Sequence, residues 1–113
     1  MLVWLIGAAT LISAASPAKP IVLDANTRAD VRCVVALSRE AVDANPEQVN
    51  DLAIMMYYFM GRIDGRDPKL DLGTAFAQQG TQMSHAEYVS AAATCRDQYR
   101  RRADELNAAA QAL

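Results

Sequence analysis

The sequence predicts an all-α protein: a small four-helix domain with one disulfide joining the first and last helices, preceded by a signal peptide. Three observations predict this architecture. Apolar residues recur at helical spacing along the chain, and no segment shows the alternation that a half-buried strand requires. The only two cysteines, Cys33 and Cys95, lie far apart and downstream of an apolar N-terminus. With 113 residues, the chain has room for one such domain.

Residues 1–15 have the features of an export signal. An apolar run begins at Leu2, and at about 11 residues it is too short to cross a bilayer as a helix. The small residues Ser13-Ala14-Ala15 follow it and suit a signal peptidase; a buried N-terminal helix is the alternative interpretation. We therefore expect a signal peptide over 1–15, an extended arm over 16–26 and a helical domain over 27–113. The expected location is periplasmic or secreted, with no stable membrane insertion of the mature chain.

The cysteine pair is expected to form a structural disulfide. An oxidising compartment lets such a bond persist, and a lone pair in an exported chain most simply bonds to itself. Redox-active pairs usually take the form Cys-x-x-Cys, whereas Cys33 and Cys95 are separated by most of the domain. We therefore predict that Cys33 and Cys95 are linked and that neither is a catalytic thiol.

The first helix is expected to start at a cap on Asn26 or Thr27, with Asp30 three residues after Thr27 in a capping-box arrangement, and to stop near Ala44. Its apolar residues share one face: Val31, Val34, Val35, Ala41 and Val42.

The second helix has the strongest periodicity. Asn45 is its expected cap, followed by Pro46 at the first helical position and Gln48 three residues after the cap. Gly65 is its expected end. The predicted apolar stripe consists of Val49, Leu52, Met56, Phe59, Met60 and Ile63, with Ala53 and Tyr57 at its margin.

Two further helices complete the domain. A short third helix is expected from Asp67-Pro68 to Gly80, and Ser84 with Glu87 forms a capping box for the fourth. Apolar residues keep helical spacing for about seven turns of this last helix, and we expect its final turns, after Leu106, to project beyond the core and fray. The apolar positions are Tyr88, Ala91, Ala92, Cys95, Tyr99, Ala103, Leu106 and Ala110.

The composition offers little for catalysis. There is one histidine, His85, so neither a convergent metal site nor a base for a nucleophilic serine is indicated, and no phosphate-binding glycine loop is present. We expect no enzyme activity, no metal and no cofactor. The formal net charge of −2 gives no electrostatic reason to expect nucleic acid. Arginines at 96 and 100–102 alternate with acidic residues, which is typical of a solvated helix surface.

The segment 55–60, Met-Met-Tyr-Tyr-Phe-Met, is the candidate binding surface. Core packing is the simplest use for these side chains, but one helix cannot bury six consecutive residues on a single face. Methionine and aromatic groups also make adaptable apolar surfaces. We therefore predict that Met55, Tyr57 and Tyr58 lie at the rim, where a dimer contact or a client protein could use them.

The sequence resembles the HdeA/HdeB-like periplasmic proteins of Gram-negative bacteria. The resemblance rests on one early and one late cysteine and on a helix in which Phe59, Gly61 and Gly65 match a hydrophobic-Gly-x-x-x-Gly turn. Members of that family include acid-activated chaperones, so the resemblance implies a non-enzymatic stress protein that binds apolar surfaces of client proteins or associates as a dimer. The alternative is a periplasmic protein-binding module such as a Rap1a/Tai-type immunity protein, although those usually contain more cysteines.

Overall fold

A computed structural model describes residues 19–113, and these residues form four α-helices without a strand. The helices are α1 (Ala25–Ala41), α2 (Pro46–Arg66), α3 (Leu72–Gln82) and α4 (His85–Gln111). The predicted all-α class is therefore confirmed. The predicted signal peptide over 1–15 lies outside the described residues. No helix among residues 19–113 combines the length and the apolar character needed to cross a membrane.

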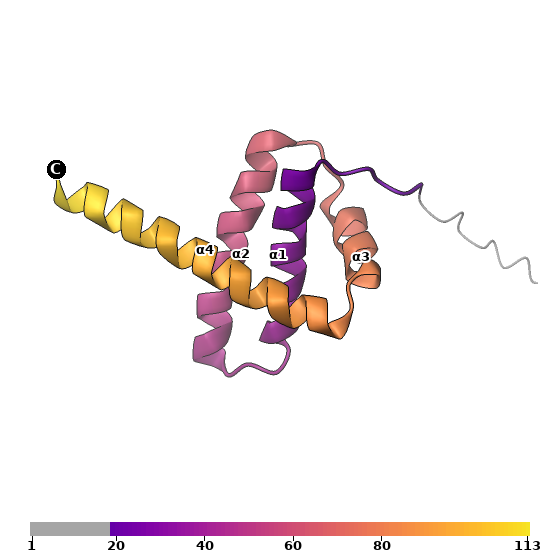
Figure 1. Cartoon of the computed structure of the whole chain (residues 1–113), viewed down its shortest axis with the longest axis horizontal. Coiled ribbons are helices and arrows are strands. Elements are labelled where there is room, and N and C mark those ends of the chain that lie inside the picture. Colours follow the sequence, from indigo (N-terminus) through magenta and orange to yellow (C-terminus); the bar gives the residue numbers. More distant parts are fainter. Residues whose placement is uncertain (1–18) are drawn as a thin grey trace, which may run out of the picture.

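Helix α1 is the centre of the arrangement. Helices α2 and α3 lie on either side of it, and α4 runs across the layer that these three helices form (Figure 1). Among the described helices, α1 packs extensively against each of the other three. Helix α4 touches α2 only slightly and reaches α3 through a hydrogen bond from the Tyr88 hydroxyl to the Gly80 carbonyl at 2.8 Å. The C-terminal half of α4 continues past α2 and away from the layer (Figure 1). The predicted projection after Leu106 is correct, but α4 stays helical to Gln111 rather than fraying.

The disulfide joins α1 to α4, as predicted. Cys33 and Cys95 are bonded, with their Cα atoms 5.6 Å apart, and both side chains are buried. Around them lies the main core, which is built mostly from α1 and α2 and is closed by α4. Its buried members are Val31, Cys33, Val34, Leu37, Leu52, Met55, Phe59, Ile63, Ala75 and Cys95. A smaller cluster lies where the N-terminal half of α4 meets α1, and it consists of Ala36, Met83, Tyr88 and Ala92.

The start of α1 differs from the prediction. The cap is Asp24, whose side chain accepts a hydrogen bond from the backbone N–H of Thr27 at 2.8 Å, and the helix begins at Ala25. Thr27 and Asp30 are therefore inside the helix, and both are buried. Asp is as good a cap as Asn and a better one than Thr, and the earlier start adds two or three residues to the helix. The helix ends at Ala41, short of the expected Ala44, and leaves Val42 exposed.

The remaining helix ends are a mixture of confirmed and wrong predictions. The capping box of Asn45 and Gln48 is present, with Pro46 at the first position of α2. Helix α2 runs through Gly65 to Arg66, α3 starts at Leu72 behind an Asp71 cap rather than at Asp67-Pro68, and Gly80 lies inside α3. Ser84 caps α4 and accepts from the backbone N–H of Glu87 at 3.2 Å, as predicted.

The buried side chains of α2 differ from the predicted apolar stripe near the middle of the helix, where Met55 is buried in place of Met56. Phe59 and Ile63 are fully buried as predicted, but Met55 is buried at 8% exposure, while Met56 and Met60 are only half-buried. The predicted rim position of Met55 is therefore wrong. The cause is α4: it crosses α2 beside Met55 and Leu52, so the buried arc of α2 faces both α1 and α4 rather than α1 alone.

The N-terminal arm is fastened to α3. The backbone N–H of Ile21 donates to Oε1 of Gln78 at 2.8 Å, and Nε2 of Gln78 donates to the carbonyl of Ile21 at 2.7 Å. Leu23 packs against the main core. The folded part of the protein therefore begins before the first helix.

The burial of Met55 in place of Met56 predicts different costs for these two adjacent methionines. Met55→Ala should lower the free energy of unfolding by about 2 to 4 kcal/mol, because it leaves a cavity in the core. Met56→Ala should cost less than about 1.5 kcal/mol, because half-buried Met56 loses less contact. Urea denaturation followed by circular dichroism measures both values. Equal costs would contradict the phase of α2 seen here.

Candidate functional site

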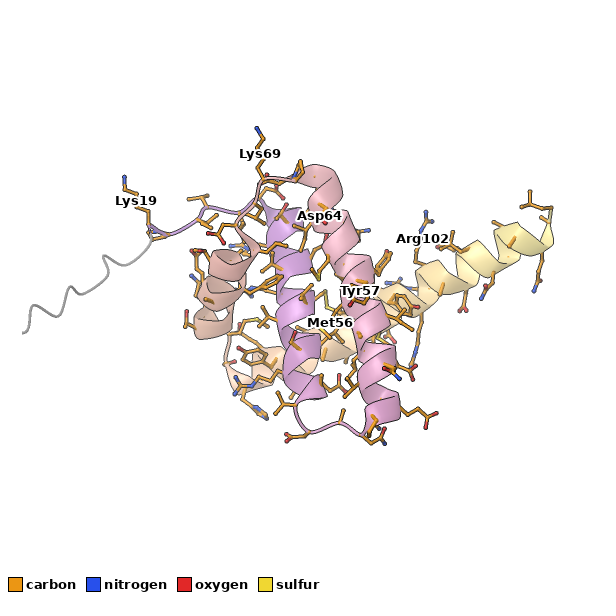
Figure 2. All side chains as sticks on the ribbon, turned by 180° about the vertical axis from the view of Figure 1, so that it is seen from behind. Lys19, Met56, Tyr57, Asp64, Lys69 and Arg102 are labelled. Atoms are coloured by element: carbon orange, nitrogen blue, oxygen red, sulfur yellow. A yellow bond between two sulfur atoms is a disulfide. The ribbon has the colours of Figure 1, made fainter. Side chains whose placement is uncertain are left out.

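The most exposed apolar surface in the helical layer lies on α2. Tyr57 is 70% exposed and Ile54 is 54% exposed, and three half-buried side chains, Ala53, Met56 and Met60, adjoin them at helical spacing. We call these five residues the α2 face. Figure 2 shows Met56 and Tyr57 on the side of the layer opposite α4, which passes behind α2 in that view.

The α2 face contains one of the three residues that the sequence indicated. Tyr57 lies on it, whereas Met55 is buried in the core. Tyr58 is half-buried on the α4 side of the helix, where its ring meets Phe59 and Tyr99 edge-on with centroids 4.9 and 5.7 Å away. Tyr58 therefore bridges α2 to α4 and is not part of the α2 face.

Sequence reasoning missed Met56 and Met60 as surface residues because it placed them in the core. Met56 also accepts a hydrogen bond at its sulfur from the Ser38 hydroxyl of α1, 3.1 Å away. Because Met56 and Met60 are only half-buried, each presents part of a flexible, polarisable side chain to solvent. The face combines two exposed apolar side chains with two adaptable ones, a composition that suits contacts with varied apolar surfaces.

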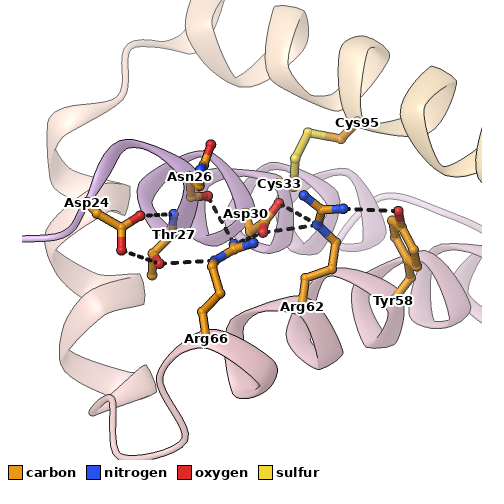
Figure 3. Close-up of polar contacts among 9 residues, drawn as sticks. All are labelled: Asp24, Asn26, Thr27, Asp30, Cys33, Tyr58, Arg62, Arg66 and Cys95. Atoms are coloured by element: carbon orange, nitrogen blue, oxygen red, sulfur yellow. Dashed lines mark hydrogen bonds and ion pairs between the residues drawn. A yellow bond between two sulfur atoms is a disulfide. The ribbon is translucent and has the colours of Figure 1, made fainter.

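A buried ionic cluster lies between α1 and α2, near the C-terminal end of α2 (Figure 3). The Asp30 side chain is 3% exposed and accepts hydrogen bonds from Arg62 Nε at 3.2 and 3.3 Å and from Arg66 Nη2. Arg66 also donates to the Thr27 hydroxyl at 3.4 Å and to the Asn26 carbonyl at 3.2 Å. One carboxylate is thus held by two guanidinium groups from the neighbouring helix.

The cluster shifts the pKa of one of its arginines. Burial alone would lower the pKa of Arg62, but hydrogen bonds to Asp30 and Tyr58 raise it above its ordinary value. Two positively charged side chains thus share one carboxylate at the contact between α1 and α2. The sequence carries a signal for this cluster that the capping-box interpretation hid: Asp30, Val34 and Leu37 share one face of α1, so Asp30 belongs to the buried side.

The carboxyl groups that cap α1 and α3 are sensitive to acid. The backbone and hydroxyl of Thr27 donate to Asp24, and those of Thr74 donate to Asp71. These hydrogen bonds lower the pKa of Asp24 and of Asp71 below the ordinary value of 3.8. A carboxyl group with a lowered pKa stabilises the fold above its unfolded pKa, and that stabilisation disappears as the pH falls through the folded value.

Other chemistry is sparse among residues 19–113. No three His, Cys, Asp or Glu side chains in this part of the chain are grouped so that they could hold a metal ion. His85 is an exposed residue in the first turn of α4.

Comparison with known proteins gives no match: no family model, no curated protein and no solved structure matches this chain.

The ionic cluster predicts a large effect of one substitution. Asp30→Asn should lower the free energy of unfolding by about 2 to 4 kcal/mol, because it leaves two arginines without their buried partner; partial exposure of the guanidinium groups keeps the cost below that of a fully buried pair. Asp64→Asn, on the exposed side of α2, is the matched control and should change stability by less than about 0.5 kcal/mol. Chemical denaturation at pH 7 distinguishes the two.

The caps predict a pH dependence. The melting temperature of the protein should fall as the pH drops below about 4, and the fall should be shallower in the double variant Asp24→Asn, Asp71→Asn. Asparagine keeps the capping acceptor but does not titrate. Melting curves between neutral pH and pH 2 provide the measurement. Parallel curves for the two proteins would show that these caps do not contribute to the acid sensitivity.

Proposed function

We propose that this protein is a non-enzymatic exported stress protein that binds apolar surfaces of client proteins, in the manner of the acid-activated HdeA-type chaperones that its sequence resembles. The observation that carries the proposal is the α2 face: Tyr57 and Ile54 are largely exposed beside two half-buried methionines on an otherwise well-packed helix. Adjoining exposed apolar residues lower the solubility of a protein, and on a small protein they commonly mark a binding site.

Acidification would expose more apolar surface, because it gives the protein a large positive charge. The sequence has 13 acidic residues, 11 Lys and Arg residues and one histidine, so full protonation takes its formal side-chain charge from −2 to about +12. Self-repulsion at that charge loosens a small domain. At the contact between α1 and α2 this repulsion includes Arg62 and Arg66, whose guanidinium groups meet at one carboxylate, and the Asp24 cap beside them loses its charge in acid.

The disulfide limits how far the loosening can go. Cys33 lies one turn after Asp30 on α1, so α1 remains tied to α4 when its contact with α2 weakens. The apolar residues between α1 and α2, Val34 and Phe59 among them, would then become accessible without complete unfolding. A client would meet the α2 face first and the opened core afterwards.

The test is suppression of client aggregation as a function of pH. Light scattering by an unrelated acid-unfolded protein should decrease severalfold in the presence of this protein near pH 3, and much less near pH 7. Ile54→Ser, Tyr57→Ser should weaken the effect at pH 3, whereas Val42→Ser, which removes an equally exposed apolar residue elsewhere, should not. Equal suppression at both pH values, or none at either, would refute the proposed function.

A further inference from the structure

The methionines of the described chain differ in their surroundings. Met55 is buried in the main core at 8% exposure, where α4 crosses α2, and Met83, just after α3, is buried at 7%. Met56 and Met60, one turn apart on the α2 face, are only half-buried. Met56 lies on the side of the layer opposite α4, so the crossing helix does not cover it (Figure 2). The α2 face therefore carries the more accessible thioether groups.

An exposed residue reaches the sulfur of Met56. The hydroxyl of Ser38, on α1, donates a hydrogen bond to Met56 Sδ at 3.1 Å, and Ser38 is itself exposed. The sulfur thus lies at the outer edge of the contact between α1 and α2. A thioether sulfur is a weak acceptor, so the serine hydroxyl would bond better to an oxygen at the same place.

The protein has no free thiol to compete for an oxidant. Its only two cysteines form the Cys33–Cys95 disulfide. Cysteine thiolates and methionine thioethers are the sulfur groups that oxidants attack, and exposure decides which of them react. Because both cysteines are bonded and buried, the half-buried methionines of the α2 face are open to such attack.

The reaction with a peroxide transfers one oxygen atom to the sulfur. A lone pair of Met56 Sδ attacks one peroxide oxygen, so that an S–O bond forms while the O–O bond breaks. The second oxygen leaves as hydroxide with the electron pair of the broken bond and takes the proton from the new S–O–H group. The products are methionine sulfoxide and water; sulfur is oxidised and the peroxide is reduced. A methionine sulfoxide reductase reverses the change.

The product suits the surroundings of Met56. A sulfoxide oxygen is a stronger acceptor than a thioether sulfur, and the Ser38 hydroxyl can rotate to donate to it. At Met55 the same oxygen would lie in the main core, where a polar group costs free energy unless it is hydrogen-bonded. The fold therefore accommodates the oxidised side chain at one of these adjacent positions and excludes it at the other.

We propose that Met56 is a site of reversible oxidation by peroxides, at which the Ser38 hydroxyl binds the sulfoxide oxygen while the fold stays intact. Met60, which is also half-buried, should react as well. The modification gives the α2 face a second, more polar chemical state. This inference goes beyond the proposed function, because the reaction requires no client protein.

Peptide mapping by mass spectrometry tests the site. The folded, disulfide-bonded protein is exposed briefly to dilute hydrogen peroxide at neutral pH, and fragment spectra assign the added oxygen to Met55 or to Met56. Met56 should be oxidised about tenfold or more faster than Met55, because a buried sulfur reacts only after local opening. In concentrated urea the two rates should become similar. Equal rates in the folded protein would overturn the proposal.

Ser38→Ala tests the role of the hydroxyl. The measurement is the fall in melting temperature on oxidation, made in a Met60→Leu background so that Met56 is the reacting methionine of the α2 face. The fall should be larger in Ser38→Ala, because the sulfoxide then lacks its partner. Ser90→Ala, which removes an exposed serine of α4, is the matched control and should not change the fall.

Equal falls with and without the Ser38 hydroxyl would overturn its assignment. Treatment with a methionine sulfoxide reductase should restore the original mass and melting temperature, and failure to do so would refute reversibility. Because no client protein is present in these experiments, their failure leaves the proposed function to be judged by its own assay.

Discussion

The Cys33–Cys95 bond fixes α4 across α1, and the direction in which the C-terminal half of α4 leaves the layer depends on it (Figure 1). Apart from its contact with α1, helix α4 has only a slight contact with α2, and the link Met83-Ser84 and one hydrogen bond from Tyr88 to Gly80 join it to α3. A bond that closes a loop of this length contributes about 4 kcal/mol in the chain-entropy model, which is comparable with the whole stability of a small domain. Without it, neither the direction of the C-terminal half of α4 nor the burial of Met55 would be well defined.

The contact between α1 and α2 is governed by a different kind of interaction. Buried ion pairs contribute little net stability, since desolvation opposes their attraction, but removal of one partner is costly. Because Asp30 bonds to both Arg62 and Arg66, the cluster favours the rotation of α2 that turns these two arginines toward α1. That rotation buries Phe59 and leaves Tyr57 in solvent. The fold is thus joined by one ionic and one covalent interaction.

The sequence was sufficient for the helical class, the disulfide and the caps at Asn45 and Ser84, because these depend on local signals or on composition. It was insufficient for features that depend on contacts between helices, such as which methionine of α2 is buried and which residues bond to Asp30. The periodicity of α2 allowed either Met55 or Met56 to be buried, and only the crossing of α4 selects Met55. Asp30 looked like part of a cap because its two partners lie more than thirty residues away in the chain. Tyr57 was recognised as a surface residue, whereas Tyr58 was not recognised as a bridge to Tyr99.

The covalent topology has a mechanical consequence. Helices α2 and α3, with the second half of α1 and the first half of α4, lie inside the loop that Cys33 and Cys95 close. A pull on the two ends of the chain would pass along the start of α1, through the sulfur–sulfur bond and out along the end of α4. The segments inside the loop would carry no tension, so stretching could detach the N-terminal arm and unwind the two outer half-helices while most of the core, Phe59 included, remained unloaded.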